Sequence, residues 1–131
     1  KAALDGEILS VFGNDFPTPD GTAIRDYVHV SDLARAHVLA LDWLLAGKPS
    51  DSFNLGTGNG YSVSEVCAAV ALAIGKKVST VVLPRRPGDA PYLVCNPAKA
   101  LKYLGWKAEY GLKEIADSAV KWHLSLHPVK P

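Results

Sequence analysis

Apolar positions along the chain recur with two periods, which predict an alternation of strands and helices. A spacing of three to four residues is typical of an amphipathic helix, and alternation at every second residue is typical of a strand. The helical spacing covers residues 32–46, 66–74 and 112–126. Strand-like segments, rich in Val, Ile, Leu and aromatic residues, cover residues 7–12, 25–30, 51–55, 78–83 and 92–95.

Polar side chains that can cap a helix precede several of the helical segments. The predicted N-caps are Ser31, Ser62 and Asn96, the last for a short helix over residues 97–104. Ser62 has Glu65 three residues later, which is the capping-box pattern. Residues 1–5 are typical of the last turn of a helix, because a glycine follows them.

Short strands mixed with helices predict a compact α+β domain rather than a complete doubly wound sheet. The chain has 131 residues, of which 48% are hydrophobic and 21% charged, so we expect one globular domain over residues 1–131. The sequence contains no methionine, even at position 1. We therefore expect a fragment of a longer chain.

Charge and cysteine usage narrow the function classes. A net charge of +1 is too balanced for a nucleic-acid-binding surface. No apolar run approaches the roughly 20 residues that a membrane span needs. Cys67 and Cys95 are predicted to be buried thiols in a reducing compartment. The sequence leaves a disulfide between them possible, whereas their spacing disfavours a metal site.

Residues 11–30 carry the first candidate site. A glycine follows Phe12, and two prolines then predict a stiff, extended loop that leads into a strand. On that strand Arg25, Tyr27 and His29 are predicted to share one face, with the intervening residues on the other. An aromatic ring close to a fixed guanidinium suits a nucleotide, because the base stacks and the phosphate takes a forked donor.

Residues 84–91 form the second candidate site, with prolines on both sides of Arg85 and Arg86. A stiff backbone loses less entropy when it grips a ligand. Asp89 lies three residues after Arg86, where it can orient that guanidinium or accept hydrogen bonds from ribose hydroxyls. An incidental salt bridge in a surface loop is the alternative, and a purely structural charge is the alternative for Arg25.

Two patterns have simpler structural interpretations. Residues 56–60 follow a predicted strand and resemble a dinucleotide motif, but Tyr61 replaces the third glycine and no acidic residue ends the next strand. We therefore predict a tight turn there. His29 is either a general base or, more commonly, a partly buried histidine with partners. The other histidines, His37, His123 and His127, lack a spacing typical of a metal site.

The motifs GNDFPTPDG and RDYVHV, with NLGTGNGYSV, RRPGDAP and the last helix, resemble the C-terminal substrate domain of the UDP-glucose 4-epimerases. These enzymes are members of the extended short-chain dehydrogenase/reductase family. The resemblance implies the UDP-sugar-binding lobe of an NAD-dependent isomerase of galactose metabolism, acting on UDP-glucose and UDP-galactose. It also implies a cytoplasmic homodimer, with NAD held by an N-terminal Rossmann half that this chain lacks.

The resemblance assigns roles to the charged candidates. Arg25 and Arg86 would hold the substrate diphosphate, in a loop that ends with Asp89, and Arg85 would stay outside. Tyr27 would line the same pocket, with core packing as the alternative.

The resemblance also assigns residues to the two ends of the substrate. Ser10, Val11 and Phe12 correspond to the segment that contacts uracil, where Phe12 gives the stacking face and the backbone reads the base edge. Leu93 would bound the hexose end and leave room for an N-acetyl group.

The catalytic motifs of that family are not in this chain. Of its tyrosines, only Tyr103 has a lysine four residues on, Lys107, and a glycine between them makes the match a coincidence. We expect no catalytic residue, cofactor or metal in the fragment, which would be inactive alone. The alternatives are the same lobe of a nucleotide-sugar dehydratase or decarboxylase, and a stand-alone binding or structural module.

Overall fold

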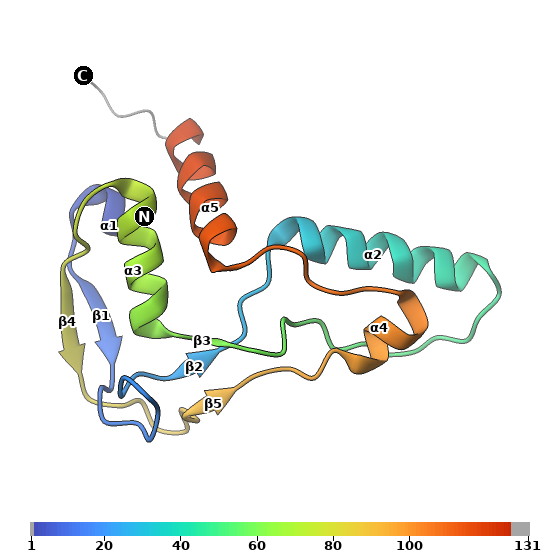
Figure 1. Ribbon diagram of the computed structural model, residues 1–131, viewed down its shortest axis with the longest axis horizontal. Coiled ribbons are helices and arrows are strands. Elements are labelled where there is room, and N and C mark those ends of the chain that lie inside the picture. The colour runs from blue at the N-terminus through green and yellow to red at the C-terminus, as the bar shows by residue number, and fades with distance from the viewer. Residues whose placement is uncertain (1, 127–131) are drawn as a thin grey trace.

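The computed structural model describes residues 2–126 and groups its elements at two ends (Figure 1). The elements are α1 (Ala2–Asp5), β1 (Leu9–Phe12), β2 (Ile24–Arg25), α2 (Val30–Leu45), β3 (Tyr61–Ser62), α3 (Val63–Ile74), β4 (Thr80–Leu83), β5 (Tyr92–Leu93), α4 (Ala98–Leu104) and α5 (Leu112–Leu126). Strands β1 and β4 lie with helices α1 and α3 at one end, α2 and α4 form an arm at the other, and α5 packs against α3.

Two small sheets set the positions of the loops. β1 and β4 are parallel, with Phe12 opposite Leu83. β2 is the centre of the second sheet, antiparallel to β3 and parallel to β5, and Arg25 lies opposite Leu93. Strands of two to four residues make few ladder hydrogen bonds, so other interactions must hold the segments between them.

Several predicted elements are confirmed. The last helix has the predicted bounds, and Ser62 with Glu65 forms the capping box at the start of α3. The predicted N-cap of the short helix was wrong, because α4 begins at Ala98 with Pro97 as its N-cap, although the side chain of Asn96 still accepts a hydrogen bond from the amide of Ala98. Of the predicted first turn, Ala2–Asp5 is helical, and Lys1 lies outside the described residues.

Other predictions were wrong. The strand predicted over residues 25–30 ends at Arg25, because α2 begins at Val30 with His29, not Ser31, as its N-cap. The imidazole Nδ1 of His29 accepts the amide of Ser31 at 3.0 Å, a role usually taken by Ser, Thr or Asp. Residues 51–55 form no strand, the fifth strand ends at Leu93, and β3 was not anticipated.

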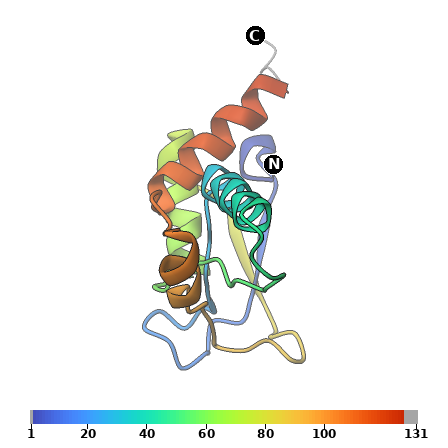
Figure 2. The ribbon, with the colours of Figure 1, turned by 90° about the vertical axis from the view of Figure 1, so that its right-hand side faces the viewer.

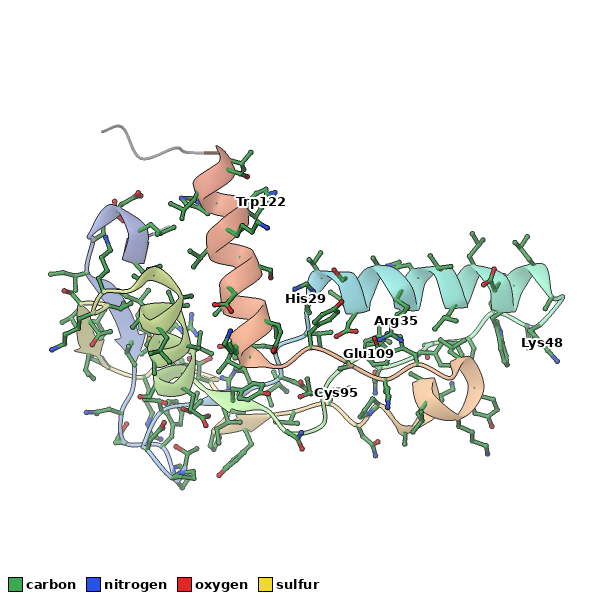
Figure 3. The ribbon with its side chains drawn as sticks, turned by 45° about the horizontal axis from the view of Figure 1, so that its top comes forward. His29, Arg35, Lys48, Cys95, Glu109 and Trp122 are labelled. Carbon is green, nitrogen blue, oxygen red and sulfur yellow. The ribbon has the colours of Figure 1, made fainter. Side chains whose placement is uncertain are left out.

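Asp32, on α2, and Trp106, which follows α4, connect the two helices of the arm. Both are fully buried. The carbonyl of Asp32 accepts the indole N–H of Trp106, and its carboxylate accepts the amides of Glu109 and Tyr110. Arg35 donates to the same carboxylate at 2.7 Å and lies 3.4 Å from Glu109, facing it across the gap between α2 and the segment after α4 (Figure 3).

Asp26 fixes the loop that leads into β3. Its Oδ1 accepts the amide and the hydroxyl of Thr57, and its Oδ2 accepts the amides of Gly58 and Cys95. Gly56 must lack a side chain, since an added Cβ would lie 2.6 Å from that of Cys95. One carboxylate therefore ties the end of β2 to two segments far away in the sequence.

The described residues contain no helix that is long and apolar enough to cross a membrane. Cys67 and Cys95 are free thiols, as predicted, but they are half-buried rather than buried, and no disulfide joins them.

We predict that Asp32 makes the fold sensitive to acid. Burial acts to raise the pKa of Asp32, but hydrogen bonds from Arg35, Glu109 and Tyr110 outweigh it and lower that pKa below 3.8. A carboxyl of lowered folded-state pKa stabilises the fold above its unfolded pKa, and this stability is lost as the pH falls through the folded value. Asp32→Asn should cost about 1–3 kcal/mol of unfolding free energy at neutral pH and flatten the loss below about pH 4.

Urea unfolding at neutral pH and at about pH 3 measures both effects. Asp117→Asn is the matched control, because it breaks only an exposed pair with Lys113. An Asp32→Asn variant with the pH dependence of the original chain would contradict the assignment.

We predict a second large effect for Asp26→Asn. The amide nitrogen would face backbone N–H groups that need an acceptor, so the free energy of unfolding should fall by about 2–3 kcal/mol. Asp42→Asn, on the exposed surface of α2, is the control. Equal urea midpoints for the two variants would show that the Asp26 contacts contribute little.

Candidate functional site

Four of the predicted site residues converge around one carboxylate. Asp89 Oδ2 lies 2.9 Å from Arg86 Nε, and Asp89 Oδ1 lies 3.6 Å from Arg25 Nη2. The guanidinium carbon of Arg86 lies 4.8 Å from the ring centre of Phe12. The loops that follow β1 and β4 reach the same end of the molecule (Figures 1 and 2), so residues from distant parts of the sequence meet there.

The backbone explains this convergence. Arg25 ends β2 and donates through Nη1 to the carbonyls of Ile24 and Ala90, each at 2.8 Å. Between Arg86 and Asp89 the chain turns at Gly88, whose φ is +85°, and the amide of Asp89 donates to the carbonyl of Arg86. Arg25 is therefore held against the turn that carries the second arginine.

β1 divides the predicted uracil segment between two faces. Ser10 and Phe12 are exposed, whereas Val11 is buried toward α3. Only the backbone of Val11 is available on the exposed side. Sequence alternation alone would have given this division.

Leu93 and Tyr27 are both placed near Arg25, Leu93 across the sheet and Tyr27 two residues further along the chain. Leu93 is opposite Arg25 on β5, with 65% of its surface exposed. Tyr27 is half-buried beyond the end of β2. Burial raises the pKa of Tyr27, the charge of Arg25 acts to lower it, and Cys67 of α3 acts to raise it. Packing and pocket lining are both compatible with this half-buried position of Tyr27.

The glycine-rich loop at residues 56–60 is not a phosphate cradle. The amides of Thr57 and Gly58, which would have to bind a pyrophosphate, donate to the Asp26 carboxylate. An anion already occupies the position of the ligand, so this loop does not fit NAD. The prediction of a tight turn is supported, although no strand precedes it.

His29 is held by contacts between helices. His29 is buried, its Nε2 lies 2.8 Å from the hydroxyl of Ser118, and its ring contacts Tyr110. It joins α2 to α5, as predicted for a histidine with partners. Within residues 2–126 no cluster of three His, Cys, Asp or Glu side chains could hold a metal, and His127 lies outside that range.

Hollows in the surface do not single out the site. A groove of about 500 Å³ runs between α3 and α5, and another of about 350 Å³ lies between α3 and the β1–β4 sheet. A third hollow, of about 460 Å³, is lined by Gly13, Asp15 and Arg85, but none of the three includes Arg25 or Arg86. Charge and convergence, rather than size, distinguish the cluster of Phe12, Arg25, Arg86 and Asp89.

Sequence reasoning overlooked Asp26. The signal was present, because the predicted strand placed Asp26 on one face with Val28 and Val30. A lone carboxylate among apolar neighbours needs several donors when it is buried. The sequence could not name those donors, which come from two other segments.

The sequence is similar to known proteins over most of its length. Residues 12–119 match the family model described as GDP-mannose 4,6 dehydratase. The UDP-glucose 4-epimerase of Bacillus subtilis is 50% identical over 119 residues, which are 91% of this chain and 35% of that protein.

Solved structures are similar in fold as well. A UDP-glucose 4-epimerase from Stenotrophomonas maltophila, with bound NAD and formylated UDP-arabinopyranose, superposes with a TM-score of 0.88 at 42% identity, covering 94% of this chain and 37% of that one. The enzyme from Bifidobacterium longum, in complex with NAD⁺ and UDP, gives 0.80 at 42% identity, covering 92% and 36%.

The chain thus spans about a third of the length of the relatives it matches. Its small mixed α/β domain corresponds to part of those structures. The family match extends over most of the described residues and includes the arginine cluster. The chain belongs to the family described as GDP-mannose 4,6 dehydratase, and the relatives it resembles there are UDP-glucose 4-epimerases of the extended short-chain dehydrogenase/reductase type.

Proposed function

We propose that this chain is the UDP-sugar-binding lobe of an NAD-dependent UDP-glucose 4-epimerase, with residues 1–131 forming one domain of it. The observation that carries the proposal is the convergence of Arg25 and Arg86 on Asp89 beside Phe12. The epimerase structures with UDP or a UDP-sugar support the same choice.

The charge of the cluster suits a diphosphate. Two guanidinium groups share one carboxylate, so the cluster keeps an excess of positive charge. A guanidinium offers a planar fork of donors that matches phosphate oxygens. In this proposal the diphosphate lies between the two arginines, and Asp89 orients them or accepts hydrogen bonds from the ribose.

The aromatic ring suits a base. Phe12 is exposed on the same face as Ser10, next to Arg86. Stacking of a base on such a ring contributes about 1–3 kcal/mol. We assign uracil to this face, with the backbone at Val11 reading the base edge and Tyr27 lining the pocket.

The rest of the protein would supply the chemistry. The 56–60 loop does not fit NAD, and in this proposal an N-terminal Rossmann half holds the cofactor and the catalytic residues. We assign the exposed apolar face of α2, with Val30, Val38, Leu41 and Leu45, to contact with that half. The unpaired residues 51–55 would join a strand there, and the whole would form a cytoplasmic homodimer.

A related activity is the second candidate. The matching family model is itself described as a dehydratase, so a nucleotide-sugar dehydratase or decarboxylase lobe is the alternative within the enzyme class. The full-length protein with UDP-glucose and, separately, with UDP-glucuronic acid decides between them. Epimerisation conserves the mass of either sugar nucleotide, dehydration of UDP-glucose removes water, and decarboxylation of UDP-glucuronic acid removes carbon dioxide. A full-length protein that neither binds nor converts UDP-sugars would favour a stand-alone binding or structural module.

In the full-length protein, we predict that Arg25→Ala and Arg86→Ala each weaken UDP binding by about 1.5–3 kcal/mol, because each removes charge-assisted hydrogen bonds. Titration calorimetry measures the affinity, and thermal unfolding checks that each variant is folded. Lys121→Gln, which removes an exposed cation on α5, is the control. Unchanged UDP affinity in both arginine variants would remove the diphosphate assignment.

We predict that Leu93 admits N-acetylated sugars. Its side chain is exposed opposite Arg25, where it would bound the hexose, and a leucine leaves more room than a tyrosine. The full-length protein should turn over UDP-galactose and UDP-N-acetylgalactosamine at comparable rates. Leu93→Tyr should selectively lower the turnover rate of the N-acetylated substrate. Unchanged turnover rates for both substrates in this variant would contradict the role of Leu93.

A further inference from the structure

Arg85 and Arg86 are adjacent in sequence but contact different partners. Arg86 pairs with Asp89, whereas Arg85 Nε lies 2.6 Å from Asp15 Oδ1, and its Nη2 donates to the carbonyl of Asp15. The guanidinium carbon of Arg85 also lies 4.2 Å from the ring centre of Phe16. Phe16 is buried, so the arginine is stacked on a fixed surface.

Gly13 makes this contact possible. Its φ is +85°, and a Cβ added there would lie 2.6 Å from Arg85 Cγ and 2.7 Å from the ring of Phe16. The amide of Gly13 donates to the carbonyl of Leu83 at 2.8 Å, a backbone hydrogen bond just past the end of β1. Beyond it the two loops meet through the Arg85 side chain.

The loop that receives Arg85 is anchored at its other end. Asp20 accepts the hydroxyl of Ser62 at the start of α3, and also the amide and hydroxyl of Thr22. The amide of Ser64 donates to the Thr22 hydroxyl. Asp15 and Phe16 therefore belong to a loop tied to a helix.

We propose that Arg85 is a positioning residue for the nucleotide site. It locks the 84–91 loop to the 13–22 loop, and so holds Arg86 beside Phe12, the residue just before Gly13. The link to UDP rests on the proposed function, but the lock itself does not. The Arg85–Asp15 pair is exposed and contributes little to global stability, so its effect is local.

The test uses the full-length protein with Arg85→Gln, Arg85→Lys, Asp15→Asn and the double variant Arg85→Gln/Asp15→Asn, and Lys121→Gln as control. The amide exchange rate of the peptide over residues 83–91, without ligand, measures how firmly the 84–91 loop is held. Calorimetry measures the resulting affinity for UDP. Thermal unfolding and the separate kcat and KM for UDP-glucose distinguish positioning from general damage.

We expect faster exchange of the Asp89 amide in Arg85→Gln, and UDP affinity about tenfold weaker, because Arg86 must be ordered on binding. KM should rise with little change in kcat or melting temperature. Arg85→Lys keeps the charge but not the fork, and should resemble Arg85→Gln. The double variant should bind UDP no more weakly than Arg85→Gln, because both changes break one contact.

Unchanged exchange over residues 83–91 in Arg85→Gln would overturn the lock. Changed exchange with unchanged UDP affinity would overturn the positioning role. Additive losses in the double variant would mean that Arg85 contacts the ligand itself, which also overturns it. If the unsubstituted protein does not bind UDP, the proposed function and the positioning role both fail, and hydrogen exchange still decides whether the lock exists.

Discussion

The carboxylate of Asp89 is the interaction on which the site depends. It is shared by two guanidinium groups, one from β2 and one from the loop after β4, which would repel each other without it. The register of β2 with β5 brings Arg25 to this carboxylate, and the turn at Gly88 brings Arg86. Shared use of one anion leaves both cations oriented and only partly neutralised, which favours exchange with a more highly charged ligand.

The same device recurs where the fold has too few strand hydrogen bonds. Asp26 accepts four hydrogen bonds and ties the 56–58 loop and Cys95 to the end of β2. Asp32 does the same between α2 and the segment after Trp106. Asp26 directly follows Arg25 in the sequence, so its contacts also hold the end of the strand that carries this arginine. Hydrogen bonds to these carboxylates thus hold together segments that the short strands do not pair.

Local signals predicted the elements whose hydrogen bonds are local. The last helix and the capping box of Ser62 and Glu65 follow from residues within one or two turns. The end of β2 was missed because His29 caps α2 with a ring nitrogen and is also fixed by Ser118, 89 residues away in the sequence. Residues 51–55 have a strand-like sequence without a strand partner in the described range. Such outcomes depend on neighbours that a single sequence does not specify.

For the candidate site, the sequence predicted which residues belong together but not how they are arranged. Proline, glycine and arginine in two loops, with the family resemblance, were enough to name Arg25, Arg86 and Asp89 together. The distances between them, the buried side of Val11 and the separate contacts of Arg85 required the backbone path. Asp26 was hidden because its four donors are dispersed over two other segments.

A crystal structure of the full-length protein with UDP tests the central claim most directly. The account predicts that phosphate oxygens lie within hydrogen-bond distance of both Arg25 and Arg86, with the uracil ring against Phe12. UDP bound elsewhere, or held by neither guanidinium, would contradict it.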